Sequence, residues 1–120
     1  MKTHHDLDVW NKSITFVTTI YELTDSFPKT EVYGLTNQIR RSAVSIPSNI
    51  AEGAGRTSLK EFAQFLSVAL GSIAELETQL IVSNNLGFLS KESFDLLLKE
   101  LISIRKMTIG LKKSLSINVK

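Results

Sequence analysis

The sequence predicts an all-α protein, an antiparallel up-down four-helix bundle. Apolar residues recur at steps of three and four in four separate segments, which is the period of an amphipathic helix. Only two prolines occur in 120 residues, so long helices are permitted. The links between the segments are short, and short links make neighbouring helices antiparallel. The even composition predicts one domain over residues 1–120.

The first helix is expected over residues 7–27. The residues that recur at helical spacing, and so are expected to form one stripe, are Trp10, Ile14, Val17, Ile20 or Tyr21, and Thr24. Pro28 ends the segment, because the residue before a proline is pushed out of the helical conformation.

The third and fourth helices have the clearest pattern. Ser58 and Glu61 form a capping-box sequence at the start of the third helix, and Gly87 can end it in the left-handed conformation. Ser90 is a suitable N-cap for the fourth. The predicted core stripes are Leu59, Phe62, Leu66, Ala69, Ile73, Leu76 and Leu80, then Phe94, Leu97, Leu101, Ile104, Thr108, Leu111 and Leu115. In the fourth helix Leu98, Ile102 and Ile109 widen the apolar face enough to serve a partner subunit as well.

The second helix, expected over residues 35–54, has two different sides. One side is apolar and predicts a core stripe of Leu35, Ile39, Ala43, Ile46 and Ile50. The other side is polar, and we expect it to contact another subunit; its residues are Gln38, Arg41, Ser45, Ser48, Asn49 and Glu52.

Pro47 lies inside this segment, where it removes one backbone donor and crowds the preceding turn. Small neighbours leave room for it, so we predict a continuous helix kinked near Pro47. The alternative is a break at Ile46 with Pro47 in the first turn of a new helix. Gly53 and Gly55 are expected to end the helix through the left-handed conformation.

Long, specific stretches resemble a known family. They include "IYELTDSFPKTEVYGLTNQIRRSAVSIPSNIAEGAGR", "EFAQFL" and "ALGSIAELETQL", and the similarity runs from Asp6 to about Leu89. The chain is similar to the bacterial 23S rRNA intervening-sequence proteins, also described as four-helix-bundle or ribosomal-protein-like proteins.

The resemblance implies a four-helix bundle that assembles into a ring of identical subunits, expected to be a pentamer. Some members are encoded within insertions in 23S rRNA genes. A related branch serves diversity-generating retroelements as an accessory protein that binds nucleic acid and a reverse transcriptase. No enzymatic activity is established for the family, so the resemblance implies a binding role.

Several functional classes lack the residues they need. There is no cysteine, and the two histidines, His4 and His5, are adjacent, so neither a metal site nor a nucleophile with its base is indicated. No cofactor is indicated, and we expect no enzyme. The start of the chain lacks the apolar core of a signal peptide, and no uninterrupted apolar run approaches the length of a membrane span. We therefore expect a cytoplasmic protein without a membrane segment.

The candidate nucleic-acid-binding residues are basic. Formal net charge is only +2, but residues 103–120 carry five cations, among them Lys120, and no acid. Such cations can also simply offset a helix dipole. The predicted phosphate contacts are Arg40, Arg41, Arg56, Lys112 and Lys113. Arg40 and Arg41 have a structural alternative, an ion pair with Glu52, Glu75 or Glu77 of the same or a neighbouring subunit.

Two hypotheses about function follow. In the first, a homo-oligomeric bundle binds rRNA or another nucleic acid through arginine and lysine contacts to phosphate. In the second, the protein is an interaction scaffold whose polar second helix forms subunit contacts, without direct nucleic-acid binding. Phe65 lies off the core stripe of its helix, so we expect it at a subunit interface.

Overall fold

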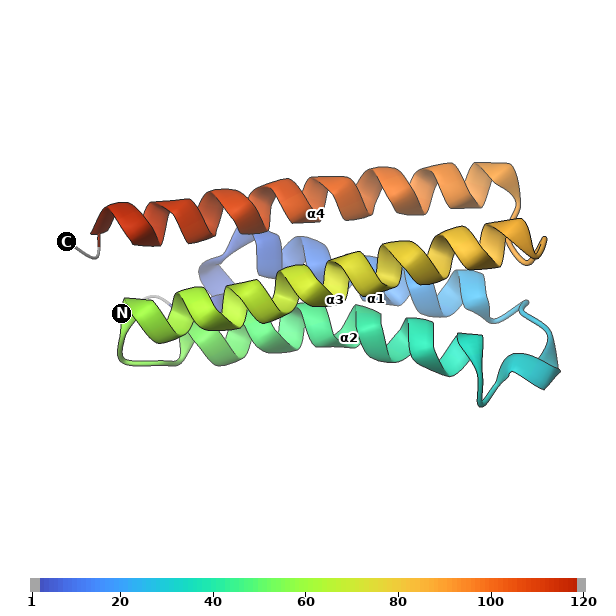
Figure 1. Cartoon of the computed structure of the whole chain (residues 1–120), viewed down its shortest axis with the longest axis horizontal. Helices are drawn as coiled ribbons and strands as arrows, with labels where there is room; N and C mark the ends of the chain where they lie inside the picture. The colour runs from blue at the N-terminus through green and yellow to red at the C-terminus, as the bar shows by residue number, and fades with distance from the viewer. Residues whose placement is uncertain (1–2, 119–120) are drawn as a thin grey trace.

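The computed structural model describes the backbone of residues 3–118 and the side chains of residues 3–116. Its four long helices are α1 (Asp8–Thr24), α2 (Leu35–Ala54), α3 (Leu59–Asn85) and α4 (Lys91–Asn118). Two short 3-10 turns, η1 (His4–Asp6) and η2 (Lys29–Glu31), precede α1 and α2. The helices lie side by side and the chain reverses direction at each connection (Figure 1). The all-α prediction is confirmed, since the described residues contain helices and no strand.

The four helices are arranged as a square. Each helix lies beside the next one along the chain and α4 lies beside α1, while the diagonal pairs α1–α3 and α2–α4 have no Cα atoms within 8 Å of each other. The bundle measures 49 × 23 × 20 Å. The square order places the outer face between α1 and α2 opposite the outer face between α3 and α4.

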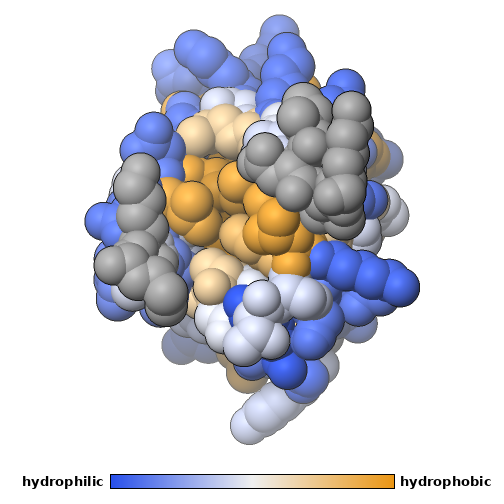
Figure 2. Space-filling view, turned by 90° about the vertical axis from the view of Figure 1, so that its left-hand side faces the viewer, coloured by the Kyte–Doolittle hydropathy of each residue, from blue (hydrophilic) through white to orange (hydrophobic). Residues whose placement is uncertain are grey.

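The core follows the predicted stripes of three helices. The buried residues include Ile39, Ala43, Ile46 and Ile50 of α2, Leu66, Ala69, Ile73, Leu76 and Leu80 of α3, and Leu97, Leu101, Ile104, Thr108 and Leu115 of α4. Seen along the bundle from the end that holds the α2–α3 connection, apolar side chains fill the middle and hydrophilic ones ring them (Figure 2). Leu59 is an exception, because it lies at the first turn of α3 and is exposed.

The predicted stripe of α1 is confirmed only in its second half, because Ile20 and Thr24 are buried whereas the earlier predicted positions are not. The residues buried in the bundle are Val9, Ser13, Phe16, Ile20 and Thr24. Trp10 and Val17 only border the core, and Ile14 is exposed. The helix has apolar residues on two adjacent sides, so spacing alone did not decide which side faces inward. α1 also ends at Thr24 rather than near Phe27.

The predicted helix caps are mostly confirmed. The Ser58 hydroxyl accepts a hydrogen bond from the Glu61 amide at 3.0 Å, and the Ser90 hydroxyl accepts one from Ser93 at 3.0 Å. Among the described residues Gly87 is the glycine with a positive φ, 79°, as expected after α3. The left-handed conformation predicted for Gly53 and Gly55 is wrong, since Gly53 lies within α2 and Gly55 caps it at a φ of −84°.

Pro47 does not interrupt α2, which runs from Leu35 to Ala54 with the proline inside it. The alternative of a break at Ile46 is therefore wrong. The ring of Pro47 is buried beside small residues, among them Ala43 and Ser48, which leave room for it. The kink itself stays a prediction.

One helix, α3, is long and apolar enough to cross a membrane by length and composition alone. An 18-residue window of this helix has a mean hydropathy of 1.4. Polar residues interrupt this window, so no uninterrupted apolar run in the sequence indicated it. The core helix of a soluble protein passes the same test, and α3 supplies Leu66, Ile73, Leu76 and Leu80 to the core. Only 28% of that window is buried, so α3 also carries many small and apolar residues on its outer side.

Gly53 of α2 lies close against α3, and we predict that Gly53→Ala destabilises the fold. An added Cβ would lie 2.8 Å from Phe62 Cδ1 and 2.8 Å from Phe65 Cβ. Overpacking of this kind costs about 1–3 kcal/mol in the free energy of unfolding, measurable by urea denaturation.

Gly110→Ala is the matched control, because nothing lies within 4 Å of a Cβ added at this exposed site in α4. At that position the change to alanine should raise the free energy of unfolding by about 0.5–1 kcal/mol, because glycine destabilises the middle of a helix. Equal effects of the two substitutions would contradict the steric account of Gly53.

Candidate functional site

The polar side of α2 faces α3 of the same chain. The Ser42 hydroxyl donates to Glu75 Oε1 at 2.6 Å, and the Ser45 and Ser72 hydroxyls share a hydrogen bond of 2.8 Å. Asn49 donates to the carbonyl and the hydroxyl of Ser45. Two of the six residues that the sequence assigns to an outer contact, Ser45 and Asn49, are therefore hydrogen-bonded within the bundle, along what we call the α2–α3 polar seam.

The seam opens into a polar groove of about 460 Å³. Its lining residues are Gln38, Arg41, Ser42, Ser45, Glu75 and Gln79. Gln79 Oε1 is buried there without a hydrogen-bond partner. The groove holds one carboxylate, from Glu75, and one guanidinium, from Arg41.

The adjacent arginines of α2 have different surroundings. Arg40 is half-buried against α1: its Nε donates to Thr24 Oγ1 at 3.0 Å and its Nη2 to the Tyr21 carbonyl at 3.2 Å. Its guanidinium also lies over the Tyr21 ring, 4.5 Å from the centroid. Arg41 is exposed and has no hydrogen bond or ion pair within residues 3–116. Arg40 thus joins two helices, and Arg41 is available to a partner.

The ion pairs considered for Arg40 and Arg41 within one chain are absent from the described residues. Glu75 instead accepts the hydrogen bond of Ser42. Glu52 pairs with Arg56 at 3.1 Å, four residues further along the chain. The predicted pairing of Arg40 or Arg41 with Glu52, Glu75 or Glu77 in the same subunit is therefore wrong.

Arg56 and Phe65 form one local cluster at the end of α2. The Arg56 guanidinium lies 4.8 Å from the centroid of the Phe65 ring, and both the arginine and its partner Glu52 are exposed. An exposed pair of this kind contributes about 0–1 kcal/mol to stability. Ser48, which also belongs to the predicted polar face, is exposed on the side of α2 that borders α1.

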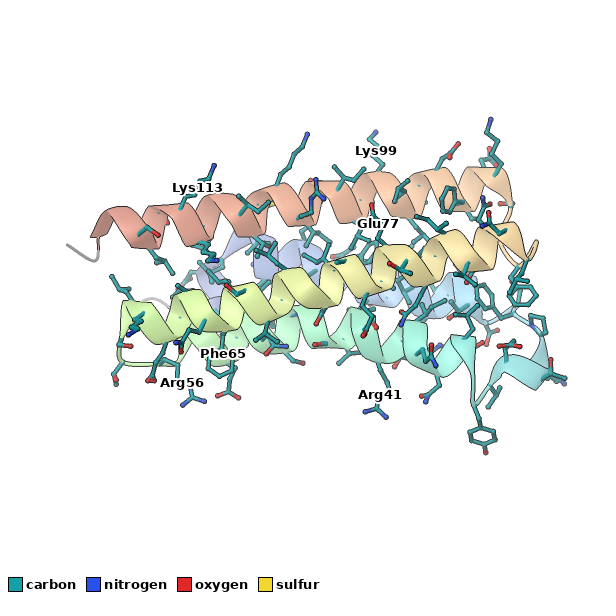
Figure 3. The ribbon with its side chains drawn as sticks, viewed as in Figure 1. Arg41, Arg56, Phe65, Glu77, Lys99 and Lys113 are labelled. Atoms are coloured by element: carbon teal, nitrogen blue, oxygen red, sulfur yellow. The ribbon has the colours of Figure 1, made fainter. Side chains whose placement is uncertain are left out.

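The predicted phosphate-binding residues do not share one surface. Arg41 and Arg56 point away from the bundle on the α2 side, whereas Lys113 points away on the α4 side (Figure 3). Lys112, next to Lys113, is half-buried. Lys120, counted in the basic C-terminal stretch, lies outside the described residues. No single face therefore gathers all the predicted cations.

A line of three lysines along α4 includes one predicted site residue, Lys113, and two that were not predicted, Lys99 and Lys106. Lys99, Lys106 and Lys113 are exposed and recur every seven residues, which keeps them on one side of a helix. None of them has an ion-pair partner in the described part of the chain, where Glu100 pairs instead with Lys12 of α1 at 2.7 Å. We call this line the α4 basic edge; its seven-residue spacing was the sequence signal that could have revealed it.

The outer face between α1 and α2 is an open apolar groove of about 340 Å³. We call it the α1–α2 groove; its apolar lining is Trp10, Ile14, Val17, Val44, Pro47 and Ala51. On the opposite side of the square, Ala74, Glu77, Ile102 and Arg105 share a small pocket between α3 and α4. Both faces carry large apolar side chains that the bundle leaves exposed.

No group of three or more potential metal ligands occurs among the described residues. The fold and its surfaces define a small helical-bundle protein that presents a basic edge, a polar seam and two apolar faces. The chain belongs to the 23S rRNA-intervening sequence protein family, whose model matches residues 5–110.

A solved structure has the same fold. It is a protein of unknown function from the S23 ribosomal protein family of Bacteroides thetaiotaomicron, 26% identical to this chain, with a TM-score of 0.79. The match covers 88% of this chain and 98% of the other. No curated protein matches the chain. The family resemblance is thereby confirmed.

The contrast between the two arginines predicts different effects of Arg40→Ala and Arg41→Ala. Arg40→Ala removes two hydrogen bonds from a charged donor and should lower the free energy of unfolding by about 1–3 kcal/mol. Arg41→Ala removes no contact within the described chain and should change it by less than about 0.5 kcal/mol. Urea denaturation of both variants beside the unchanged protein tests this, and equal losses would contradict the assigned roles.

Proposed function

We propose that this protein is a non-enzymatic, self-assembling four-helix bundle that binds structured RNA or another nucleic acid through phosphate contacts, in the cytoplasm. The observation that carries the proposal is the α4 basic edge. Lys99, Lys106 and Lys113 lie on one line, and the described residues place no carboxylate within ion-pair distance of them.

The spacing of this edge suits a phosphate backbone. Seven helical residues span about 10 Å, so successive lysines can meet separate phosphates along a nucleic acid. Lysine acts as a point charge, which favours affinity without base specificity. Of the residues predicted from the sequence, Lys113 belongs to this edge. Arg41 and Arg56 lie on the other side, so they would contact the same molecule only if it wraps around the bundle or around an assembly.

Self-assembly matters to this function because one copy carries little net positive charge. Formal net charge is +2, and three lysines give modest affinity. Several basic edges held in one assembly would act together, because each contact raises the effective concentration for the next. A homopentamer, implied by the family resemblance, would present five such edges.

A second candidate function is an interaction scaffold, which the two exposed apolar faces favour. In this alternative the faces hold other copies or a different protein, with a reverse transcriptase as one partner that the resemblance suggests. The polar side of α2 has a smaller part in it than predicted, because Ser45 and Asn49 are bonded inside the chain. Gln38, Ser48 and Glu52 remain exposed on that helix.

The nucleic-acid proposal predicts that Lys106→Gln/Lys113→Gln weakens RNA binding and its dependence on salt. Each lysine that neutralises a phosphate contributes about 0.9 to the slope of log K against log salt on a duplex, so the double substitution should lower the slope by about 1.8. Fluorescence anisotropy with a labelled RNA hairpin, titrated at several salt concentrations, measures both quantities.

Lys29→Gln/Lys60→Gln is the matched control, since it removes the same charge from exposed sites off the α4 edge. It should leave the salt slope nearly unchanged. Equal effects of the two double variants would show non-specific attraction by net charge, and absence of binding at low salt would refute the proposal.

A further inference from the structure

We infer that the polar groove of the α2–α3 seam binds a guanine base, either of a free nucleotide or at an unpaired position of an RNA. The inference goes beyond the proposed function, because phosphate contacts along α4 need no base-specific site and use a different surface. Three observations carry it: a row of hydrogen bonds that stops short, an acceptor buried without a partner at that point, and a carboxylate beside an unpartnered guanidinium.

The seam is a row of polar pairs that runs along two antiparallel helices. Ser45 of α2 shares a hydrogen bond with Ser72 of α3. Three residues earlier on α2 and three residues later on α3, Ser42 donates to Glu75. The two pairs follow one register, because each step back along α2 is matched by an equal step forward along α3.

The next pair in this register is Gln38 of α2 and Gln79 of α3, four residues further along each helix. Both glutamines line the groove, but the row of bonds does not continue to them: Gln79 Oε1 is buried and has no hydrogen-bond partner in the described part of the chain. Buried acceptors are almost always bonded, since one left without a donor is unfavourable. A ligand that brings an N–H group to this point therefore makes a hydrogen bond that the chain alone does not make.

Arg41 and Glu75 place opposite charges on the two walls of the groove. Arg41 is exposed, and none of its five N–H donors is used within residues 3–116. Glu75 accepts from Ser42 at Oε1, which leaves Oε2 and the remaining lone pairs for a ligand. The α3 wall thus offers acceptors, and the α2 wall offers donors.

This arrangement matches the edge of guanine. On guanine the N1–H and N2–H₂ donors are adjacent, and the O6 and N7 acceptors follow them around the ring. A carboxylate can accept from N1–H and one N2–H together, which leaves the second N2–H for Gln79. The guanidinium of Arg41 can donate to O6 and N7, the commonest specific contact of an arginine with a base. Adenine, cytosine and uracil each present a single donor group on the base-pairing edge, so none of them supplies both acceptors of the α3 wall.

The mixed charge of the lining disfavours an ion as the occupant. A phosphate would meet the carboxylate of Glu75, and a cationic side chain would meet the guanidinium of Arg41. A neutral, planar ring with its donors and acceptors on adjacent sides suits both walls. The groove has a volume of about 460 Å³, within the range of about 300–1,000 Å³ that small-ligand sites occupy. Unpaired bases of RNA are read on these same edges.

A single base change in a short RNA tests the site. The probes are labelled oligouridines with one central guanosine, inosine or adenosine, titrated by fluorescence anisotropy. Inosine lacks the N2 amino group of guanosine and keeps the rest of the edge. The guanosine probe should bind about 5- to 150-fold more tightly than the other two, which is the discrimination that a good bidentate contact gives.

Titration calorimetry with guanosine monophosphate and adenosine monophosphate is a second arm that needs no RNA. A guanine preference in both arms supports a site for the base itself. A preference in the oligonucleotide arm alone supports an unpaired base of RNA as the ligand, and one in the mononucleotide arm alone supports a free nucleotide. Absence of a guanine preference from both arms would overturn the inference.

Glu75→Gln and Gln79→Leu should each reduce the preference for guanosine over inosine and adenosine. Glu75→Gln replaces one of two acceptors by a donor, and Gln79→Leu removes the unpartnered acceptor. Gln79→Leu should not lower the free energy of unfolding in urea, because an apolar group of similar size replaces a buried group that has no bond. This measurement separates a binding role from a structural one, and a preference that survives both substitutions would overturn the inference.

Glu22→Gln is the matched control, since it removes the same charge from an exposed position on α1 that does not line the groove. It should keep the guanine preference, and loss of the preference here would assign it to net charge and overturn the groove. Lys106→Gln/Lys113→Gln should weaken all the oligonucleotides alike and leave the preference unchanged. The salt slope therefore tests the phosphate contacts of α4, and the base preference tests the groove separately.

Discussion

The close approach of α2 and α3 is the constraint on which the other surfaces depend. Gly53 lies so near Phe62 and Phe65 that a methyl group has no space there. Along the same two helices the hydroxyl of Ser42 donates to Glu75, and the hydroxyls of Ser45 and Ser72 share a hydrogen bond. Part of the polar side of α2 is therefore used within the chain, and Gln38 and Arg41 remain exposed beside it.

Two neighbouring arginines illustrate how the packing divides structural from external roles. A helix turns by about 100° per residue, so Arg40 and Arg41 cannot face the same way. Arg40 is directed to α1, where Thr24 and Tyr21 accept its hydrogen bonds. Arg41 is directed outward and has no hydrogen-bond or ion-pair partner in the described part of the chain. A single basic motif therefore contains one residue that holds the fold and one that can serve function.

The square arrangement separates the surfaces by chemistry. Apolar faces lie on two opposite sides and the polar seam on a third. The α4 basic edge borders the α3–α4 face, because Lys106 lies four residues from Ile102 and Lys113 four residues from Ile109. The same fold occurs in a solved structure from the S23 ribosomal protein family, with a TM-score of 0.79.

The sequence by itself determined four helices, most of their ends, the core stripes of α2, α3 and α4, and part of the core stripe of α1. Periodicity and capping residues such as Ser58, Ser90 and Gly87 act locally, so they can be recognised along the chain. Only the tertiary structure decided which apolar side of α1 faces inward. It also showed that a side chain at Gly53 would clash with α3, and that Arg40 is bonded to α1 whereas Arg41 is exposed. These depend on which helix lies beside which, because burial and hydrogen bonding between distant segments have no local signal.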